Sequence, residues 1–264
     1  METLTVPGQQ LRVRAALGRD EKFFFITAIV MAVMLVAGFS IHLALGRSSF
    51  DVPLRFHVHG LLFFGWTTLY VAQNTLVATG SLALHRRLGW LATLWIPAMV
   101  ISGIFITTVN VRTGRVPVFF EPALFLVMNT LGALCFSALG AAAIQMRRNT
   151  QWHRRLMFCA MATILAPGFG RLLPMPFLIP WADWATAGAS MLFPLAGVVR
   201  DLRKDGRVHP AWWWGLGAML GTQLLVRGIA HGAFGLAIYQ AVTSGSAAAL
   251  PPLQFQFQLP IPGG

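Results

Sequence analysis

The stretch Phe23–Leu45 reads FFFITAIVMAVMLVAGFSIHLAL and contains no Asp, Glu, Lys or Arg. A helix that crosses a bilayer needs ~20 predominantly apolar residues, because ~30 Å of hydrocarbon must be spanned with all backbone hydrogen bonds made internally. These 23 residues meet that length. They also exceed the ~7–15-residue apolar core of a secretory signal peptide, so we expect a spanning helix that stays in the mature protein.

The composition of the whole chain agrees with this interpretation. Of 264 residues, 56% are hydrophobic and only 11% are charged. Soluble domains carry roughly 25% charged residues, so a soluble enzyme is excluded. Intrinsic disorder is excluded as well, because 12% of the residues are aromatic and large aliphatic residues are abundant. The sequence therefore predicts an all-α, polytopic membrane protein.

Six further segments are long and apolar enough to be spans, which gives a bundle of about seven helices. The fifth and sixth segments are separated by a proline-rich stretch. The six predicted spans are Phe56–Thr79, Leu88–Val109, Phe119–Met146, Leu156–Leu173, Trp181–Val199 and Ala211–Ala241.

The distribution of basic residues predicts the orientation. With seven spans, 14 of the 20 Lys and Arg residues fall on the side of the N-terminus, five fall on the other side, and Arg227 lies within the last helix. The 14 are Arg12, Arg14, Arg19, Lys22, Arg86, Arg87, Arg147, Arg148, Arg154, Arg155, Arg200, Arg203, Lys204 and Arg207. Because cytoplasmic loops are enriched in Lys and Arg, we expect a cytoplasmic N-terminus and an external C-terminus in a bacterial inner membrane.

The net charge of +12 does not indicate that the protein binds nucleic acid. The bases form short clusters between apolar runs rather than one soluble basic face, and such clusters can rest against anionic lipid. The expected partners are the lipid bilayer and either a membrane protein complex or a second copy of the chain.

The chain divides into three predicted parts: a cytoplasmic arm at 1–22, a transmembrane bundle at 23–243 and an extended extracytoplasmic tail at 244–264. Within the bundle, His85-Arg-Arg-Leu88 and His153-Arg-Arg-Leu156 repeat at the inner ends of two hairpins, which suggests a duplicated centre at 55–172. The tail contains four prolines and alternates at period two over Leu253–Leu259. The tail can add a strand to the sheet of a partner protein. Alternatively, it can be a loosely ordered segment or can pack on its own domain.

Two polar stripes mark the candidate functional helices. His59 and Gln73 share one face of the second predicted helix, and Gln223, Arg227 and His231 share one face of the seventh. Lipid would not tolerate these faces, so we expect both to point into the bundle, with His59 and His231 at similar depth. His57 points about 200° away from His59, so only one of the two can face a given site.

Paired imidazoles from two helices can supply both axial ligands of a b-type haem. The sequence offers an outer pair, His57 or His59 with His231, and an inner pair, His85 with His153; arginines beside them could bind haem propionates. Further polar residues would line or support the site. These are His42, Gln73, Glu121, Arg171, Gln223 and Arg227, with Glu121 as a candidate partner of Arg227.

Other interpretations fit the same residues. His85 and His153 can be part of a solvated basic face, and His59 and His231 can be interhelical hydrogen-bond partners or line the pathway of a small-solute or proton-coupled transporter. A non-catalytic membrane scaffold is the third possibility. Cys135 and Cys159 lie inside apolar segments and have no metal-binding spacing, and no acid, base and nucleophile set is recognisable, which leaves enzymatic turnover open.

The blocks His57-Val-His59-Gly, His85-Arg-Arg-Leu-Gly-Trp90 and His153-Arg-Arg-Leu-Met157 resemble an uncharacterised family of bacterial multi-pass membrane proteins of the domain-of-unknown-function type. The resemblance covers about residues 55–172. Some proteins of this type look similar to haem-linked oxidase maturation factors or histidine-ligated cytochromes. The resemblance therefore implies haem binding for electron transfer or for assembly of a respiratory complex.

Overall fold

The computed structural model describes residues 18–257. Within this range the chain forms α-helices and two short 3₁₀ segments and no strand, which confirms the predicted all-α class. The α-helices are α1 (Arg19–Ala44), α2 (Leu54–Ala78), α3 (Leu82–Gly89), α4 (Leu91–Arg112), α5 (Pro122–Gln145), α6 (Thr150–Thr163), α7 (Ala166–Leu172), α8 (Ala182–Asp205), α9 (Pro210–Ala230) and α10 (Ala233–Thr243). The 3₁₀ segments are η1 (Met146–Arg148) and η2 (Met175–Leu178).

Three helical stretches are both long and apolar enough to cross a membrane: Asp20–Ala44, Leu91–Arg112 and Pro122–Arg148. They indicate an integral membrane protein. Large apolar side chains also face outward elsewhere on the bundle, and Leu61, Leu94 and Ile101 are at least 70% exposed. Because monomeric soluble proteins rarely expose large contiguous apolar patches, these faces are suited to contact lipid.

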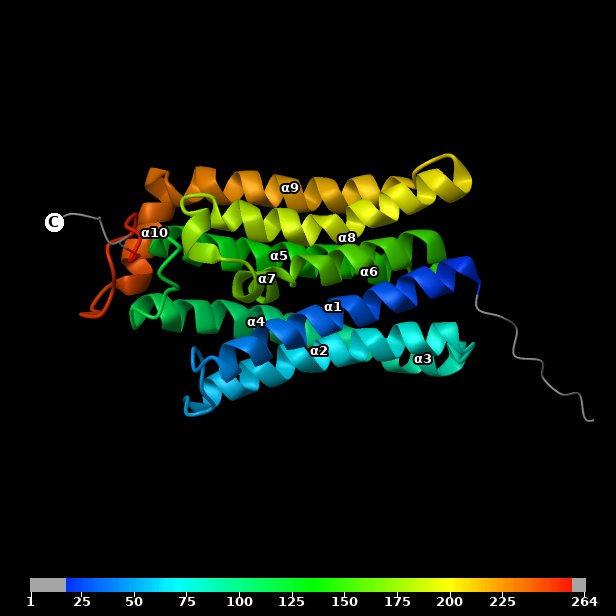
Figure 1. Cartoon of the computed structure of the whole chain (residues 1–264), viewed down its shortest axis with the longest axis horizontal. Helices are drawn as coiled ribbons and strands as arrows, with labels where there is room; N and C mark the ends of the chain where they lie inside the picture. The colour runs from blue at the N-terminus through cyan, green and yellow to red at the C-terminus, as the bar shows by residue number, and fades with distance from the viewer. Residues whose placement is uncertain (1–17, 258–264) are drawn as a thin grey trace, which may run out of the picture.

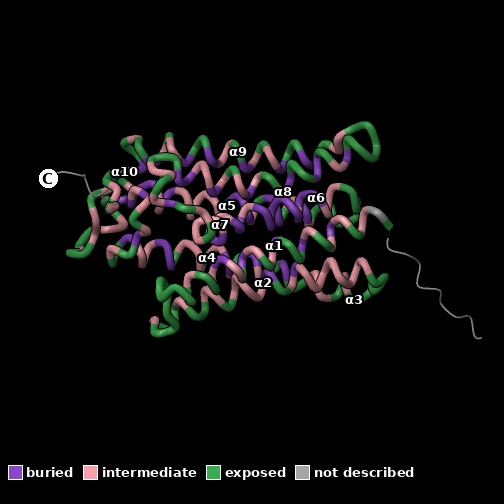
Figure 2. The backbone as a smooth tube through the Cα atoms, in the orientation of Figure 1, coloured by how far each residue is buried: buried purple, intermediate pink, exposed green. Residues whose placement is uncertain are grey.

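The long helices α1, α2, α4, α5, α8 and α9 lie roughly along the longest axis of the molecule (Figure 1). Helix α5 is central, because it packs against α4, α6 and α9. Buried residues concentrate in the middle of the bundle, whereas the connecting loops are exposed (Figure 2). One end of the bundle carries α3 and the connection between α8 and α9, and we call it the basic end because Arg86, Arg87, Arg203, Lys204 and Arg207 lie there.

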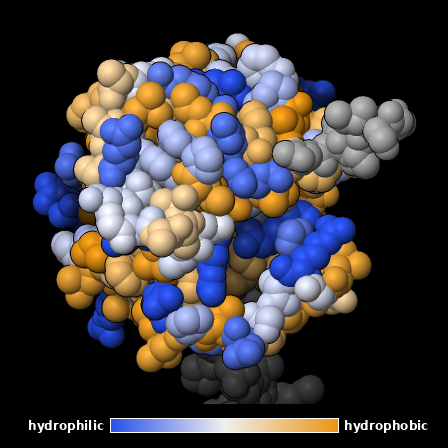
Figure 3. Space-filling model, turned by 90° about the vertical axis from the view of Figure 1, so that its left-hand side faces the viewer, coloured by the Kyte–Doolittle hydropathy of each residue, from blue (hydrophilic) through white to orange (hydrophobic). Residues whose placement is uncertain are grey.

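The end opposite the basic end carries α10 and the described part of the tail (Figure 1). Its surface mixes hydrophilic and hydrophobic residues (Figure 3). The tail lies on its own bundle: the backbone N–H of Ala123 donates to Pro252 O at 2.9 Å, and that of Gln256 donates to Val118 O at 3.1 Å. Residues 244–257 thus cover the loop between α4 and α5, and residues 258–264 of the predicted tail lie outside the described range.

Two of the predicted continuous helices are interrupted. The predicted helix Ala211–Ala241 breaks after Ala230, and α10 turns across the end of α9, where a Cβ at Gly235 would lie 2.1 Å from Ile229 O. The predicted helix Leu156–Leu173 divides into α6 and α7, whereas the predicted helix Leu88–Val109 corresponds to α4, which begins at Leu91. Hydropathy remains high across such breaks, so it could not reveal them.

The predicted cytoplasmic arm at 1–22 differs at its end from the structure. Helix α1 begins at Arg19, so the last four residues of the predicted arm are helical. Asp20 and Glu21 lie in the first turn, where acidic side chains stabilise the positive end of the helix dipole. Residues 1–17 of the arm lie outside the described range.

Candidate functional site

The structure brings His85 and His153 together near the basic end. His85 lies on the short helix α3, and His153 lies in the first turn of α6, which Asn149 caps by accepting hydrogen bonds from Gln151 N (3.2 Å) and Trp152 N (3.4 Å). The two imidazole centroids are 6.3 Å apart and the ring planes are nearly perpendicular, at 80°. The inner histidines are thus near neighbours across two helical hairpins.

Each of these rings is held through its Nδ1 atom. His153 Nδ1 donates to the Ala143 carbonyl at 2.8 Å. With its amide oxygen accepting from Gly89 N (2.9 Å), Gln73 donates to His85 Nδ1 at 2.5 Å. Neither Nε2 atom has a hydrogen-bond partner within residues 18–257. A ligating histidine usually donates its other ring N–H to a fixed acceptor, as His153 does to Ala143. His85 differs, because its Nδ1 accepts from Gln73 and its Nε2 therefore carries the proton when the ring is neutral.

The electrostatic surroundings favour neutral imidazole at His85. Burial lowers the pKa of His85, and the neighbouring His153 lowers it further. A neutral imidazole has the free lone pair that ligation requires. In the tautomer that Gln73 selects, this lone pair is on Nδ1 of His85; ligation through Nε2 requires the Gln73 amide to turn so that its oxygen accepts from Nδ1–H.

The separation of the rings fits one shared iron. Two imidazoles that bind one metal at ~2.0 Å each have centroids roughly 6 Å apart. Within residues 18–257, no group of three or more His, Cys, Asp or Glu side chains could hold a metal ion. Haem needs only two axial protein ligands because its porphyrin supplies four nitrogens, so this pair fits haem better than a structural zinc site.

The outer histidines have separate partners. His231 lies at the end of α9, where Nε2 contacts Glu121 Oε2 at 2.8 Å and Nδ1 contacts Arg227 O at 3.0 Å. His59 Nδ1 contacts Ser102 Oγ at 3.1 Å, and its ring packs against Phe63. The two rings thus contact different helices: His59 of α2 meets Ser102 of α4, and His231 at the end of α9 meets Glu121 at the start of α5. His57 is exposed, and His42 lies in the last turn of α1.

Arg227 pairs with Asp183 rather than with Glu121. Its Nε donates to Asp183 Oδ2 at 3.0 Å and its Nη2 donates to Asp183 Oδ1 at 2.6 Å, while Gln223 donates to the same carboxylate at 2.7 Å. Sequence reasoning missed Asp183. The available signal was an acidic residue inside the predicted span Trp181–Val199, where an ionisable group is costly unless it is paired.

A second buried ion pair was also missed. Arg155, expected in a solvated loop, is only 3% exposed and forms a bidentate contact with Asp201 on α8, with Nε–Oδ2 at 3.1 Å and Nη2–Oδ1 at 3.0 Å. The Trp212 indole N–H donates to Asp201 Oδ2 at 2.9 Å. These contacts join α6, α8 and α9 near the basic end.

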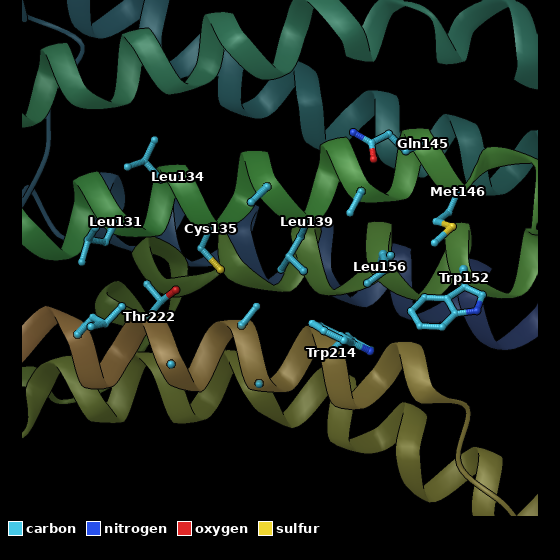
Figure 4. A pocket seen from close by; sticks show the side chains of 16 residues that line it. Leu131, Leu134, Cys135, Leu139, Gln145, Met146, Trp152, Leu156, Trp214 and Thr222 are labelled. Atoms are coloured by element: carbon cyan, nitrogen blue, oxygen red, sulfur yellow. The ribbon is translucent and has the colours of Figure 1, made fainter.

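An apolar cavity of about 750 Å³ lies between α5, α6 and α9. Leu139, Trp152 and Trp214 are among its lining side chains (Figure 4). No histidine lines it, so it is separate from the His85–His153 pair. Comparisons of the chain with protein-family models, with curated proteins and with solved structures find no match.

Proposed function

We propose that the chain crosses a bacterial inner membrane seven times, with the N-terminus in the cytoplasm and the C-terminus outside. Helices α1, α2, α4, α5, α8 and α9 have 21 to 26 residues, and α6 with α7 would form the remaining crossing. Helices α2, α8 and α9 are less apolar than the other long helices because they carry polar side chains. Several of these, including Asp183, Gln223 and Arg227, bond to one another inside the bundle.

We further propose that His85 and His153 bind one b-type haem near the cytoplasmic face. The observation that carries this proposal is the 6.3 Å separation of two rings that are each held through Nδ1. Arg86 and Arg87 directly follow His85 and are exposed, and guanidinium groups match the geometry of propionates. The two arginines that follow His153 are already paired with Asp20 and Asp201. When bound, the haem would supply one-electron chemistry, for electron transfer or for assembly of a respiratory complex.

The contacts of His59 and His231 favour one haem site over two. His231 is engaged by Glu121, and His59 by Ser102, so neither presents a matched second ligand across the bundle. Transfer of electrons across the whole membrane would therefore need a partner. The proposed haem site would exchange electrons with a partner at the cytoplasmic face.

The test is a dithionite-reduced minus oxidised absorption spectrum of the protein purified in mild detergent. We expect a b-type difference band at about one haem per chain, either as purified or after addition of hemin. His85→Ala and His153→Ala should each abolish the band. His57→Ala is the matched control, because His57 is exposed at the far end of the bundle and its removal should leave the band unchanged.

A colourless, metal-free preparation that takes up no hemin would overturn the haem proposal. The second candidate would then be a small-solute or proton-coupled transporter. The observation that favours it is the polar chain of Gln223, Asp183 and Arg227 beside the Glu121–His231 contact. Its test is accessibility of single cysteines along α2 and α9 to thiol reagents, which a polar pathway would permit from one side of the membrane.

A further inference from the structure

Arg171 is a half-buried cation whose charge has no carboxylate partner in the described structure. It lies in the last turn of α7, and its guanidinium carbon is 3.9 Å from the centre of the Phe39 ring. Its Nη1 donates to the Pro167 carbonyl at 2.8 Å, but its Nε atom is buried without any hydrogen-bond partner. The side chain thus retains unused donors in an apolar setting.

The other buried arginines are neutralised. Arg155 pairs with Asp201, Arg227 with Asp183, and Arg154 with Asp20 at 2.6 Å. For Arg171, no Asp or Glu of residues 18–257 lies within ion-pair distance. A buried charge without a counter-charge is expensive, and an ionisable group within a membrane protein is by default a candidate binding site.

The backbone fixes where this cation lies. Helix α7 packs directly against α1, and a Cβ at Gly38 would lie 2.8 Å from Gly168 O. A Cβ at Gly168 would in turn lie 3.0 Å from a methyl group of Leu35. The close approach of the two helices holds Arg171 on the α1 side of the bundle, where Phe39 supports its guanidinium.

Two imidazoles lie on the helices beside Arg171. His42 lies one turn beyond Phe39 on α1, and Phe39 is the ring that Arg171 contacts. His59 lies on α2, which packs against α1, and its Nδ1 contacts Ser102 Oγ at 3.1 Å, which leaves Nε2 for another contact. Neither imidazole forms an ion pair with a carboxylate of residues 18–257.

We propose that Arg171 forms a binding site for an oxyanion, either a carboxylate or a phosphate group. Guanidinium binds both groups through two parallel N–H···O hydrogen bonds. The anion can come from a lipid headgroup of the adjacent leaflet or from a small free anion. The site is at the opposite end from the His85–His153 pair and does not depend on haem.

The first test measures thermal unfolding of the protein in a maltoside detergent, which contains no phosphate. Inorganic phosphate or acetate is added at constant ionic strength, with chloride as the reference, and phosphatidylglycerol is compared with a phosphate-free neutral glycolipid. A saturable rise of the unfolding temperature with phosphate or acetate indicates a free anion. A rise with phosphatidylglycerol alone indicates a headgroup. No rise with any of them would overturn the proposal.

The second test uses variants. Arg171→Gln should lose the rise, and Arg171→Lys, which keeps the charge but lacks the paired donors, should weaken binding by about tenfold or more, as followed by titration calorimetry with inorganic phosphate. Arg55→Gln is the matched control, because Arg55 is an exposed arginine that also lies over a phenylalanine ring. Equal responses of the wild type and Arg171→Lys would contradict a site built on the guanidinium, even if Arg171→Gln fails to fold.

Discussion

Asp201 accepts hydrogen bonds from the Arg155 guanidinium, the Trp212 indole and the backbone N–H of His209, although only 1% of its side chain is exposed. Asp183 has a similar role for Arg227 and Gln223 on α9. Each carboxylate thus compensates an arginine that the surrounding apolar helices could not otherwise accommodate. The chain has only eight Asp and Glu residues, so few carboxylates are available to neutralise its buried arginines. Each buried carboxylate therefore contributes to stability.

We expect Asp201→Asn to destabilise the protein by about 3–5 kcal/mol, because the substitution leaves Arg155 buried without a counter-charge. Unfolding in detergent, followed by circular dichroism during a denaturant titration, measures the change. Asp205→Asn is the control: Asp205 is exposed at the end of the same helix, and its substitution should change stability by no more than about 0.5 kcal/mol. Equal effects of the two substitutions would show that the buried pair does not stabilise the bundle.

Helix α9 packs against α6 through a glycine. A Cβ built at Gly215 would lie 2.2 Å from Cys159 Sγ and 2.7 Å from Cys159 Cβ. Gly217, half a turn further along the helix, would meet nothing within 4 Å. Small residues allow transmembrane helices to approach closely, and Gly215 does so in this bundle, whereas Gly217 lines the apolar cavity.

This difference predicts opposite outcomes for the same substitution on one helix. Gly215→Ala should destabilise the protein by about 1–3 kcal/mol, because α9 must move away from α6 to make room. Gly217→Ala should leave stability within about 1 kcal/mol of the wild type, because alanine favours a helix and meets no neighbour. Thermal unfolding of the two variants under identical detergent conditions makes the comparison; a larger loss for Gly217→Ala would contradict the observed packing.

The bundle as a whole has a basic end and an opposite end that carries α10 and the tail (Figure 1). Because positively charged loops are usually retained in the cytoplasm, this asymmetry is the basis of the proposed orientation. Both native cysteines are buried, so single exposed cysteines can report on sidedness against a low background.

In intact cells, a membrane-impermeant maleimide should label Ser49→Cys and Ser244→Cys. Ser81→Cys should react only after permeabilisation. All three residues are exposed, Ser49 and Ser244 at the end opposite the basic end and Ser81 beside α3 at the basic end. Labelling of Ser81→Cys from outside, or protection of Ser244→Cys, would rule out the seven-span arrangement with an external C-terminus.

The sequence alone determined the helical class and the basic end. Hydropathy is a local property, and a run such as Phe23–Leu45 must form a helix in lipid because no water is present to satisfy its backbone. The repeated His-Arg-Arg-Leu blocks also indicated the proximity of His85 and His153, since each follows a helix that runs toward the basic end. These inferences needed only short-range sequence patterns and the fact that successive helices of a bundle run in alternating directions.

Tertiary structure decided the partners of the ionisable groups. Asp183 and Arg227 are 44 residues apart, and Arg155 and Asp201 are 46 apart, so their pairing depends on which helix faces pack together. The partners of the histidines are long-range as well: His231 contacts Glu121, which is 110 residues away, and His59 contacts Ser102, which is 43 residues away. A periodic pattern gives the polar face of a helix, but the angle, depth and end of each helix follow only from contacts with its neighbours.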